Sequence, residues 1–186
     1  EDPSLSSSIL DVYRNASYAK EGGGNSFYNR EHSWPKSYGF PSDGTGNYPY
    51  TDCHALFLCD SGYNSSRSNK PFGVCSSSCA EKVTDPNGGQ GGGTGTYPGN
   101  SNWTSGSLSS GTWEVWSGRR GDVARALFYM DVRYDGGTHG ITGVSEPDLI
   151  LTDDVALIAS SNTGSNEAVG YMGLLTVLRQ WHLDDP

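Results

Sequence analysis

The chain lacks any apolar run near the ~18 residues that a membrane-spanning helix needs, so we expect no membrane segment. Positive charge is also scarce: 12 Lys and Arg stand against 21 Asp and Glu, for a net charge of −9. Such an acidic composition, taken alone, argues against nucleic-acid binding, which requires a basic face. Hydrophobic residues make up only 34% of the chain, so we expect many loops.

Glycine, by contrast, is abundant, with 26 of the 186 residues. The length predicts a single domain, residues 1–186, with enough chain to bury a core. Four cysteines, few lysines and many small polar residues favour an extracellular compartment. The chain starts at Glu1 without a signal peptide, which we interpret as a processed mature protein or an expressed fragment of one.

The positive charges are unevenly distributed along the chain. From Glu146 to the C-terminus there are seven acids and one base, Arg179. Chance clustering on solvated faces is one explanation, and a local basic cleft on an acidic body is the other. Eight of the twelve positive residues lie in or beside the segments 28–37, 52–73 and 120–134: Arg30, Lys36, Arg67, Lys70, Arg119, Arg120, Arg125 and Arg133.

The segment YNREHSWPKS, residues 28–37, places a carboxylate, Glu31, next to an imidazole, His32. Pro35 forces the residue before it into an extended conformation and prevents a helix from running through, so we predict a strand or tight loop. A glutamate beside a histidine can supply a metal ligand and a general base to one site. An isolated Glu-His pair is more often part of a solvated loop, so the other segments must decide.

NREHSWPKS closely resembles the signature of the bacterial endonuclease I family, which comprises secreted or periplasmic non-specific nucleases of the His-Me finger (ββα-metal) class. DCHALFLCDSGYNSSRSNKPFG, residues 52–73, resembles the D-x-H-N-L…N-x-x-R-S-N segment of this family. RGDVARALFYMDVRY, residues 120–134, resembles its R-G-D-[IV]-A-R-A…F-Y-M helix, and LLTVLRQWHLDDP its closing helix. The resemblance spans nearly the whole chain. It implies an α+β fold with a small ββα-metal core embedded in helices and long Gly-rich loops.

By this resemblance, His32 is the general base, Glu31 is a metal ligand and Asn64 is the second ligand. Neighbouring strand residues face opposite ways, so we expect a bulge or an end of the strand between Glu31 and His32. Asn64 and Asn69 are five residues apart, and we expect only one of them to point at the cleft. The expected cofactor is one divalent cation, Mg²⁺ with Mn²⁺ or Ca²⁺ as alternatives, because a hard cation that keeps several waters needs few protein ligands.

The cations of these segments are candidates for contact with substrate phosphates. We assign Lys36, Arg67 and Arg120 to substrate binding, and Arg125, with His32, to the catalytic group. A guanidinium presents a fork of donors that suits phosphate oxygens. For each arginine, a structural salt bridge is the alternative.

The remaining histidines are assigned structural or surface roles. The D-x-H element of the family is not its general base, so we interpret His54 as structural, with a ligand or a second acid as the alternatives. The chain departs from the family pattern at Ala55, where the family has Asn, which puts the local geometry in doubt. His139 and His182 are interpreted as surface or helix-end residues.

The cysteines are Cys53, Cys59, Cys75 and Cys79, and four thiols allow three pairings. We predict disulfides Cys53–Cys59 and Cys75–Cys79, or one pairing across the two groups. A four-thiolate zinc site is the alternative, but spacings of six and four residues do not give the usual ligand pairs.

Residue periodicity gives an outline of the secondary structure. Helices are predicted over residues 4–16, 122–134 and 171–182, a helix with a broken middle over 54–69, and a short strand at 113–115. Loops are predicted over 38–51 and over the low-complexity segment 88–102.

The resulting hypothesis is a secreted or periplasmic, monomeric endonuclease. As the resemblance implies, it would be metal-dependent and sequence-non-specific, hydrolyse phosphodiester bonds of DNA and also RNA, and leave 5′-phosphates. Two alternatives stay open. One is a non-catalytic extracellular nucleic-acid-binding module with this fold, and the other is a metal-dependent hydrolase of another phosphoester or a glycan.

Overall fold

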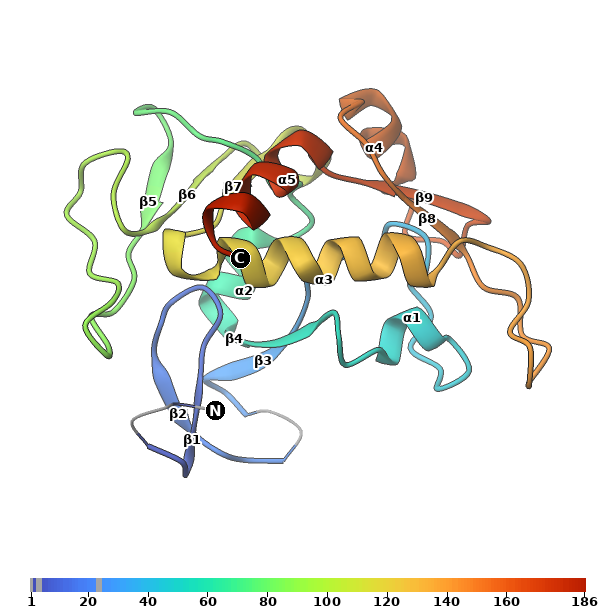
Figure 1. The fold of residues 1–186 in the computed structure, drawn as a ribbon, viewed down its shortest axis with the longest axis horizontal. Coiled ribbons are helices and arrows are strands. Elements are labelled where there is room, and N and C mark those ends of the chain that lie inside the picture. Colours follow the sequence, from blue (N-terminus) through green and yellow to red (C-terminus); the bar gives the residue numbers. More distant parts are fainter. Residues whose placement is uncertain (1, 3–4, 23–24) are drawn as a thin grey trace.

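The structure is a computed structural model that describes residues 2, 5–22 and 25–186. The long helix α3 (Arg120–Arg133) crosses the molecule, and small sheets and shorter helices surround it (Figure 1). The fold is α+β, as predicted. The core is strongly aromatic, and all five tryptophans are buried: Trp34, Trp103, Trp113, Trp116 and Trp181.

The strands of the described residues form four small sheets rather than one large one. Three sheets are antiparallel: β1 (Ser8–Leu10) with β2 (Ser17–Ala19), β3 (Tyr28–His32) with β4 (Leu56–Asp60), and β5 (Ala80–Lys82) with β6 (Asn102–Ser105) and β7 (Thr112–Glu114). The fourth is parallel, β8 (Asp148–Leu151) with β9 (Val169–Met172). The strand predicted at 113–115 is therefore confirmed as β7, one residue earlier.

The helix predicted over residues 4–16 is wrong, although Ser4 itself lies outside the described residues. Two strands, β1 and β2, occupy this region instead. Between them the buried Asp11 side chain accepts the backbone N–H groups of Tyr13 (2.8 Å) and Arg14. Such local side-chain acceptors compete with helical hydrogen bonds, and Asn15 adds a left-handed turn at φ 62°.

The helix predicted over residues 54–69 is half wrong. Residues 56–60 form strand β4, and only α2 (Ser61–Arg67) is helical. The Asp60 carboxylate caps α2 by accepting the N–H groups of Gly62 (2.8 Å) and Tyr63 (3.2 Å). The chain thus runs β3, then β4, then α2, and the helix packs against both strands.

The helix predicted at 122–134 is confirmed as α3, with Val123, Leu127 and Met130 fully buried on one face. The predicted closing helix begins later, as α5 (Leu175–Asp184), because residues 169–172 form β9. Helices α3 and α5 pack against each other and seal the core. The other helical segments are α1 (Tyr48–Thr51), which lies in a predicted loop, α4 (Val155–Ser161), and the 3₁₀ turns Leu108–Ser110 and Ser117–Arg119.

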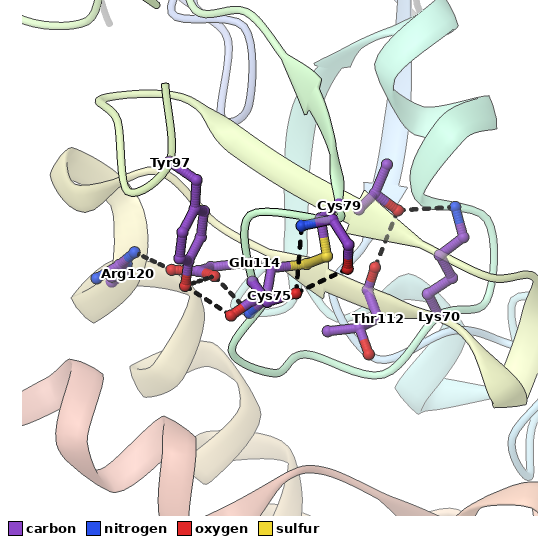
Figure 2. Close-up of a disulfide and its surroundings, with 10 residues drawn as sticks. Lys70, Cys75, Cys79, Tyr97, Thr112, Glu114 and Arg120 are labelled. Carbon is purple, nitrogen blue, oxygen red and sulfur yellow. Dashed lines mark hydrogen bonds and ion pairs between the residues drawn. A yellow bond between two sulfur atoms is a disulfide. The ribbon is translucent and has the colours of Figure 1, made fainter. Parts of the chain in front are cut away.

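One of the predicted disulfides is present. Cys75 and Cys79 are bonded and close a short loop beside β7 (Figure 2). The predicted Cys53–Cys59 bond is wrong, because Cys53 is exposed and Cys59 is a free thiol in the core. A disulfide needs Cα atoms within about 7 Å, and β4 carries Cys59 away from the exposed turn that holds Cys53. In the part of the chain that the structure describes, no helix is long and apolar enough to cross a membrane.

Candidate active site

A polar cleft of ≈ 450 Å³ lies where strand β3 meets helix α2. Strand β3 supplies one wall, α2 and the residues after it supply the second, and the Pro35 turn and α1 close one end. The lining residues are Asn29, Arg30, Glu31, His32, Pro35, Lys36, Tyr50, Asn64, Ser65, Arg67, Ser68 and Asn69. The structure therefore brings together five of the predicted site residues, Glu31, His32, Lys36, Asn64 and Arg67.

Glu31 and His32 reach this cleft without the expected bulge. The pairing of β3 with β4 is continuous through Glu31–Phe57 and His32–Leu56, so the two side chains lie on opposite faces of the strand. Among the described residues, strand β3 pairs with one strand, β4, which leaves its other edge open. Both faces meet at that edge, and this is how neighbouring residues line one cleft.

The Glu31 carboxylate lies on the inner face, with 2% of the residue exposed. Its Oε1 atom accepts a hydrogen bond from Tyr13 Oη at 2.8 Å and lies 3.1 Å from Arg67 Nη1. Burial raises the pKa of Glu31, while the Arg67 charge and the Tyr13 hydroxyl act in the opposite direction. Both contacts are made to Oε1. Arg67 therefore balances the charge of the Glu31 carboxylate, and Oε2 remains available to another ligand.

Arg67 is a structural residue rather than an open phosphate contact. Its side chain is 1% exposed and lies over the Phe72 ring at 4.5 Å. Besides its pairing with Glu31, it donates to the backbone oxygens of His32 (3.1 Å) and Ser33 (2.7 Å). Arg67 thus holds the end of β3 in place, which is the salt-bridge alternative left open by the sequence.

His32 lies on the outer face of β3, stacked on the Tyr50 ring with 4.8 Å between ring centroids. Its Nε2 atom is 2.9 Å from the Tyr50 backbone oxygen. A carbonyl can only accept, so Nε2 carries the proton and Nδ1 has the free lone pair. Burial lowers the pKa of His32, and the positive charges of Lys36, Arg30 and Arg67 lower it further. The hydrogen bond to Tyr50 acts in the opposite direction and raises it. The neutral imidazole that a general base requires is therefore favoured near pH 7.

Asn64 projects from α2 toward β3. Its Nδ2 atom donates to Asn29 Oδ1 at 2.6 Å and to the Arg30 backbone oxygen at 3.2 Å. Because a backbone carbonyl only accepts, this contact fixes the orientation of the amide and leaves Oδ1 for a ligand. One carboxylate and one amide oxygen suit a hard divalent cation that keeps several waters, so the residues present fit such an ion. Among the described residues there is no group of three or more His, Cys, Asp and Glu side chains that could hold a metal.

Comparison with known proteins identifies the family to which this chain is related. A family model described as Endonuclease I matches residues 3–186. The chain belongs to the endonuclease I family. It is 37% identical over 189 residues to an extracellular ribonuclease of Bacillus amyloliquefaciens, and 35% identical over 188 residues to an extracellular ribonuclease of Bacillus subtilis (strain 168). Each alignment covers 100% of this chain and 52% of the relative, so the chain spans about half the length of these curated relatives. No solved structure matches it.

Lys36 and Asn69, for which the sequence of this endonuclease I family member also allowed predictions, line the same cleft. Lys36 pairs with Asp43 at 2.8 Å and lies over the Tyr50 ring at 5.4 Å, with 46% of its side chain exposed. Asn69 also lines the cleft, but its Nδ2 atom donates to Asn162 Oδ1 at 3.4 Å, and Asn162 is not a lining residue, whereas the Asn64 amide is held against β3. The turn after α2, in which Ser68 has a φ of 52°, ends the helix.

Arg120 and Arg125 lie outside this cleft, although both belong to a family motif. Arg120 Nη2 pairs with Glu114 Oε1 at 2.6 Å, and the other Glu114 oxygen accepts the N–H of Cys75, so Arg120 supports the disulfide loop (Figure 2). Arg125 pairs with Asp122 and donates to the Asp185 backbone oxygen, both at 2.8 Å. The motif therefore ties the start of α3 to two distant segments, and neither arginine is among the residues brought to Glu31 and His32.

His54 forms a separate cluster at the start of β4. Its Nδ1 atom lies 2.9 Å from Asp52 Oδ1, and its ring stacks on Tyr129 with centroids 4.3 Å apart. Asp52 also accepts from Tyr129 (3.0 Å) and Tyr134 (2.8 Å), so the D-x-H element fastens the turn before β4 to α3. This geometry agrees with a structural role. Ala55 is buried, and its backbone oxygen accepts the N–H of Ser33 at 3.0 Å.

Sequence reasoning missed three residues that shape the site. Tyr13 bonds the Glu31 carboxylate, Tyr50 holds the His32 ring, and Asn29 holds the Asn64 amide. Tyr13 and Tyr50 lie 18 residues away in sequence from the groups they contact, in segments without a motif. Asn29 lies inside the motif, and its i, i+2 relation to Glu31 on one strand face was a signal that could have identified it.

Proposed function

We propose that this chain is a metal-dependent endonuclease that hydrolyses phosphodiester bonds of nucleic acids, with β3, β4 and α2 as its ββα-metal core. The observation that carries the proposal is the His32 imidazole, held by the Tyr50 backbone oxygen, in the same cleft as Glu31 and Asn64. Membership of the endonuclease I family and the names of the two curated relatives support it.

In this proposal, His32 Nδ1 removes a proton from the attacking water. The Tyr50 backbone oxygen assists by accepting the hydrogen bond from Nε2–H, which keeps the ring in the required tautomer and orientation. A positioned general base contributes roughly 10²–10⁴-fold to the rate. The imidazolium that forms shares the cleft with Glu31, and the Arg67 contact to the His32 backbone keeps both residues in position.

Glu31 and Asn64 would hold one divalent cation, for which Mg²⁺ fits the oxygen ligands best, with Mn²⁺ or Ca²⁺ as alternatives. When bound, such an ion would supply positive charge to the phosphate and to the leaving 3′ oxygen, and departure of that oxygen would leave a 5′-phosphate on the product. The chain itself contributes the ligand geometry: Arg67 and Tyr13 orient the carboxylate, and Asn29 orients the amide.

We infer that the substrates are RNA and DNA without sequence preference, because the cleft offers phosphate-directed groups such as Lys36 in an open groove. The names of the relatives favour RNA as one substrate, and the extracellular location in those names, together with the Cys75–Cys79 disulfide, favours a secreted protein.

The test is cleavage of supercoiled plasmid and of a long RNA with Mg²⁺ and with EDTA. The expected result is cleavage of both, its loss in EDTA, and end-labelling that identifies 5′-phosphates. Binding without cleavage would favour a non-catalytic module, and hydrolysis of a small phosphoester or a glycan without action on nucleic acid would favour the other alternative.

A further inference from the structure

The open edge of strand β3 presents a specific set of backbone groups to the cleft. In an antiparallel pair, alternate residues direct their N–H and C=O groups toward the partner strand or away from it. Ser33 N–H donates to Ala55 O at 3.0 Å, which places the odd-numbered residues of this segment on the β4 side. Leu58, opposite Arg30, accepts instead from Val12 on the side away from β3. Arg30 and His32 therefore direct their backbone groups to the open edge.

The carbonyl groups on this edge are already occupied by donors from the chain itself. The three pairs are Tyr28 O with Asn25 N (3.1 Å), Arg30 O with Asn64 Nδ2 (3.2 Å) and His32 O with Arg67 Nη1 (3.1 Å). An edge strand with occupied carbonyls cannot pair with another strand, because such pairing needs donors and acceptors in alternation.

Unlike the carbonyl groups, the N–H groups on this edge are not all engaged in hydrogen bonds. Tyr28 N–H donates to Asn25 Oδ1 at 3.0 Å, but those of Arg30 and His32 have no hydrogen-bond partner among the residues that the structure describes. Both residues line the cleft, and the Arg30 side chain, on the same strand face as His32, is exposed. The edge thus offers donors and a positive charge, which is the chemistry that an anion requires.

We propose that this edge binds the phosphate backbone of the substrate: the N–H groups of Arg30 and His32 donate to phosphate oxygens of one strand, with the Arg30 guanidinium beside them. This inference rests on the proposed nuclease function and adds the way in which substrate is held. The two donors are two residues apart, about 6.6 Å along a strand, which suits neighbouring phosphates. Backbone donors do not read bases, so the contact is independent of sequence.

The contact also explains how a chain of net charge −9 binds a polyanion. Backbone N–H groups attract phosphate without adding side-chain charge, and they act over short range only. Fixed donors on a strand whose carbonyls are held by Asn64 and Arg67 need no rearrangement when substrate arrives.

The test separates the N–H group from the side chain at position 30. In the full chain, Arg30→Ala removes the guanidinium, and lactic acid at position 30 removes the N–H group as well while keeping the methyl group. Binding of a fluorescent single-stranded oligonucleotide is measured by anisotropy in EDTA, so that hydrolysis does not interfere. The ester is expected to bind about tenfold more weakly than Arg30→Ala, because hydrogen bonds to charged groups are among the stronger ones.

The matched control is lactic acid at position 80, the same chemical change at Ala80 on β5, outside the cleft. It is expected to bind as the parent does. Thermal unfolding of each ester checks that the fold is kept. Equal affinity of Arg30→Ala and its ester, with both folded, would overturn the proposal.

A second measurement remains available if the ester at position 30 does not fold. Phosphates of the oligonucleotide are replaced one at a time by neutral methylphosphonates, and binding to Arg30→Ala is measured. Two neighbouring positions are expected to weaken binding, and uniform insensitivity would contradict the proposal. A parent chain that binds in EDTA but cleaves nothing with Mg²⁺ would refute the nuclease function and leave this edge contact standing.

Discussion

The cleft at β3 and the start of helix α3 both concentrate arginines and carboxylates, yet they use them differently. At α3, Arg125 pairs with Asp122 at a partly exposed position, and Arg120 pairs with Glu114. At the cleft, the ion pair of Glu31 and Arg67 is buried, and the groups in front of it remain open to substrate. The comparison teaches that an arginine in a family motif marks either a site or its scaffold, and that burial and partners decide between them.

The largest expected effect is on catalysis and comes from His32. His32→Ala should lower the rate of plasmid cleavage by at least about 10²-fold while the fold is kept, because the proton acceptor is lost. His54→Ala is the matched control, since His54 is exposed and bonded to Asp52 away from the cleft, and it should cleave at close to the parental rate. The opposite ranking of the two variants would make His54 the base.

Arg67 should have the largest effect on stability. Arg67→Ala leaves Glu31 buried without its counter-ion and should lower the free energy of unfolding by about 3–5 kcal/mol. Arg125→Ala breaks the ion pair with Asp122, in which the Arg125 side chain is 39% exposed. It should lower the free energy of unfolding by only about 1 kcal/mol. Urea denaturation of both variants measures the difference. Equal losses would mean that the buried and the partly exposed ion pair contribute equally to stability, so that burial does not distinguish them.

An intermediate effect is expected on the metal requirement. Asn64→Ala removes one of the two proposed ligands and should raise the Mg²⁺ concentration for half-maximal cleavage about tenfold or more. Asn69→Ala, which lines the same cleft, should leave this concentration nearly unchanged. Titration of Mg²⁺ into each variant gives the answer, and a raised requirement in Asn69→Ala alone would transfer the ligand role to Asn69.

The smallest effect concerns salt. Each phosphate contact made by a cation contributes about 0.9 to the slope of log affinity against log salt for duplex DNA. Lys36→Ala should therefore reduce this slope by about 1, whereas Arg120→Ala should not change it, because Lys36 lines the cleft and Arg120 lies outside it. Binding of one duplex across a NaCl series in EDTA measures both slopes. A parental slope equal to six or more released ions would indicate a wider basic face than the cleft provides.

Much of the site could be predicted because its chemistry lies in short segments. Glu31, His32 and Asn64 were named from the motifs, and the structure brings them to one cleft. The failed predictions involve long-range context. The N-terminal helix was wrong because Asp11 turns the chain back, and Cys59 is not in a disulfide because β4 directs it into the core. Periodicity over a few residues does not contain these interactions.

By itself, the sequence determined helix α3 and the set of groups available for chemistry, because both depend on residue types at short, regular spacings. The resemblance of its motifs indicated the family and, through it, the α+β class. Tertiary structure alone decided which of these groups act together. Strand β3 became an edge, so that Glu31 and His32 meet in one cleft across its two faces. Arg125 donates instead to the backbone oxygen of Asp185, 60 residues further along the chain. Partners so far apart in sequence are chosen by burial and by the need of each buried charge and carbonyl for a counterpart.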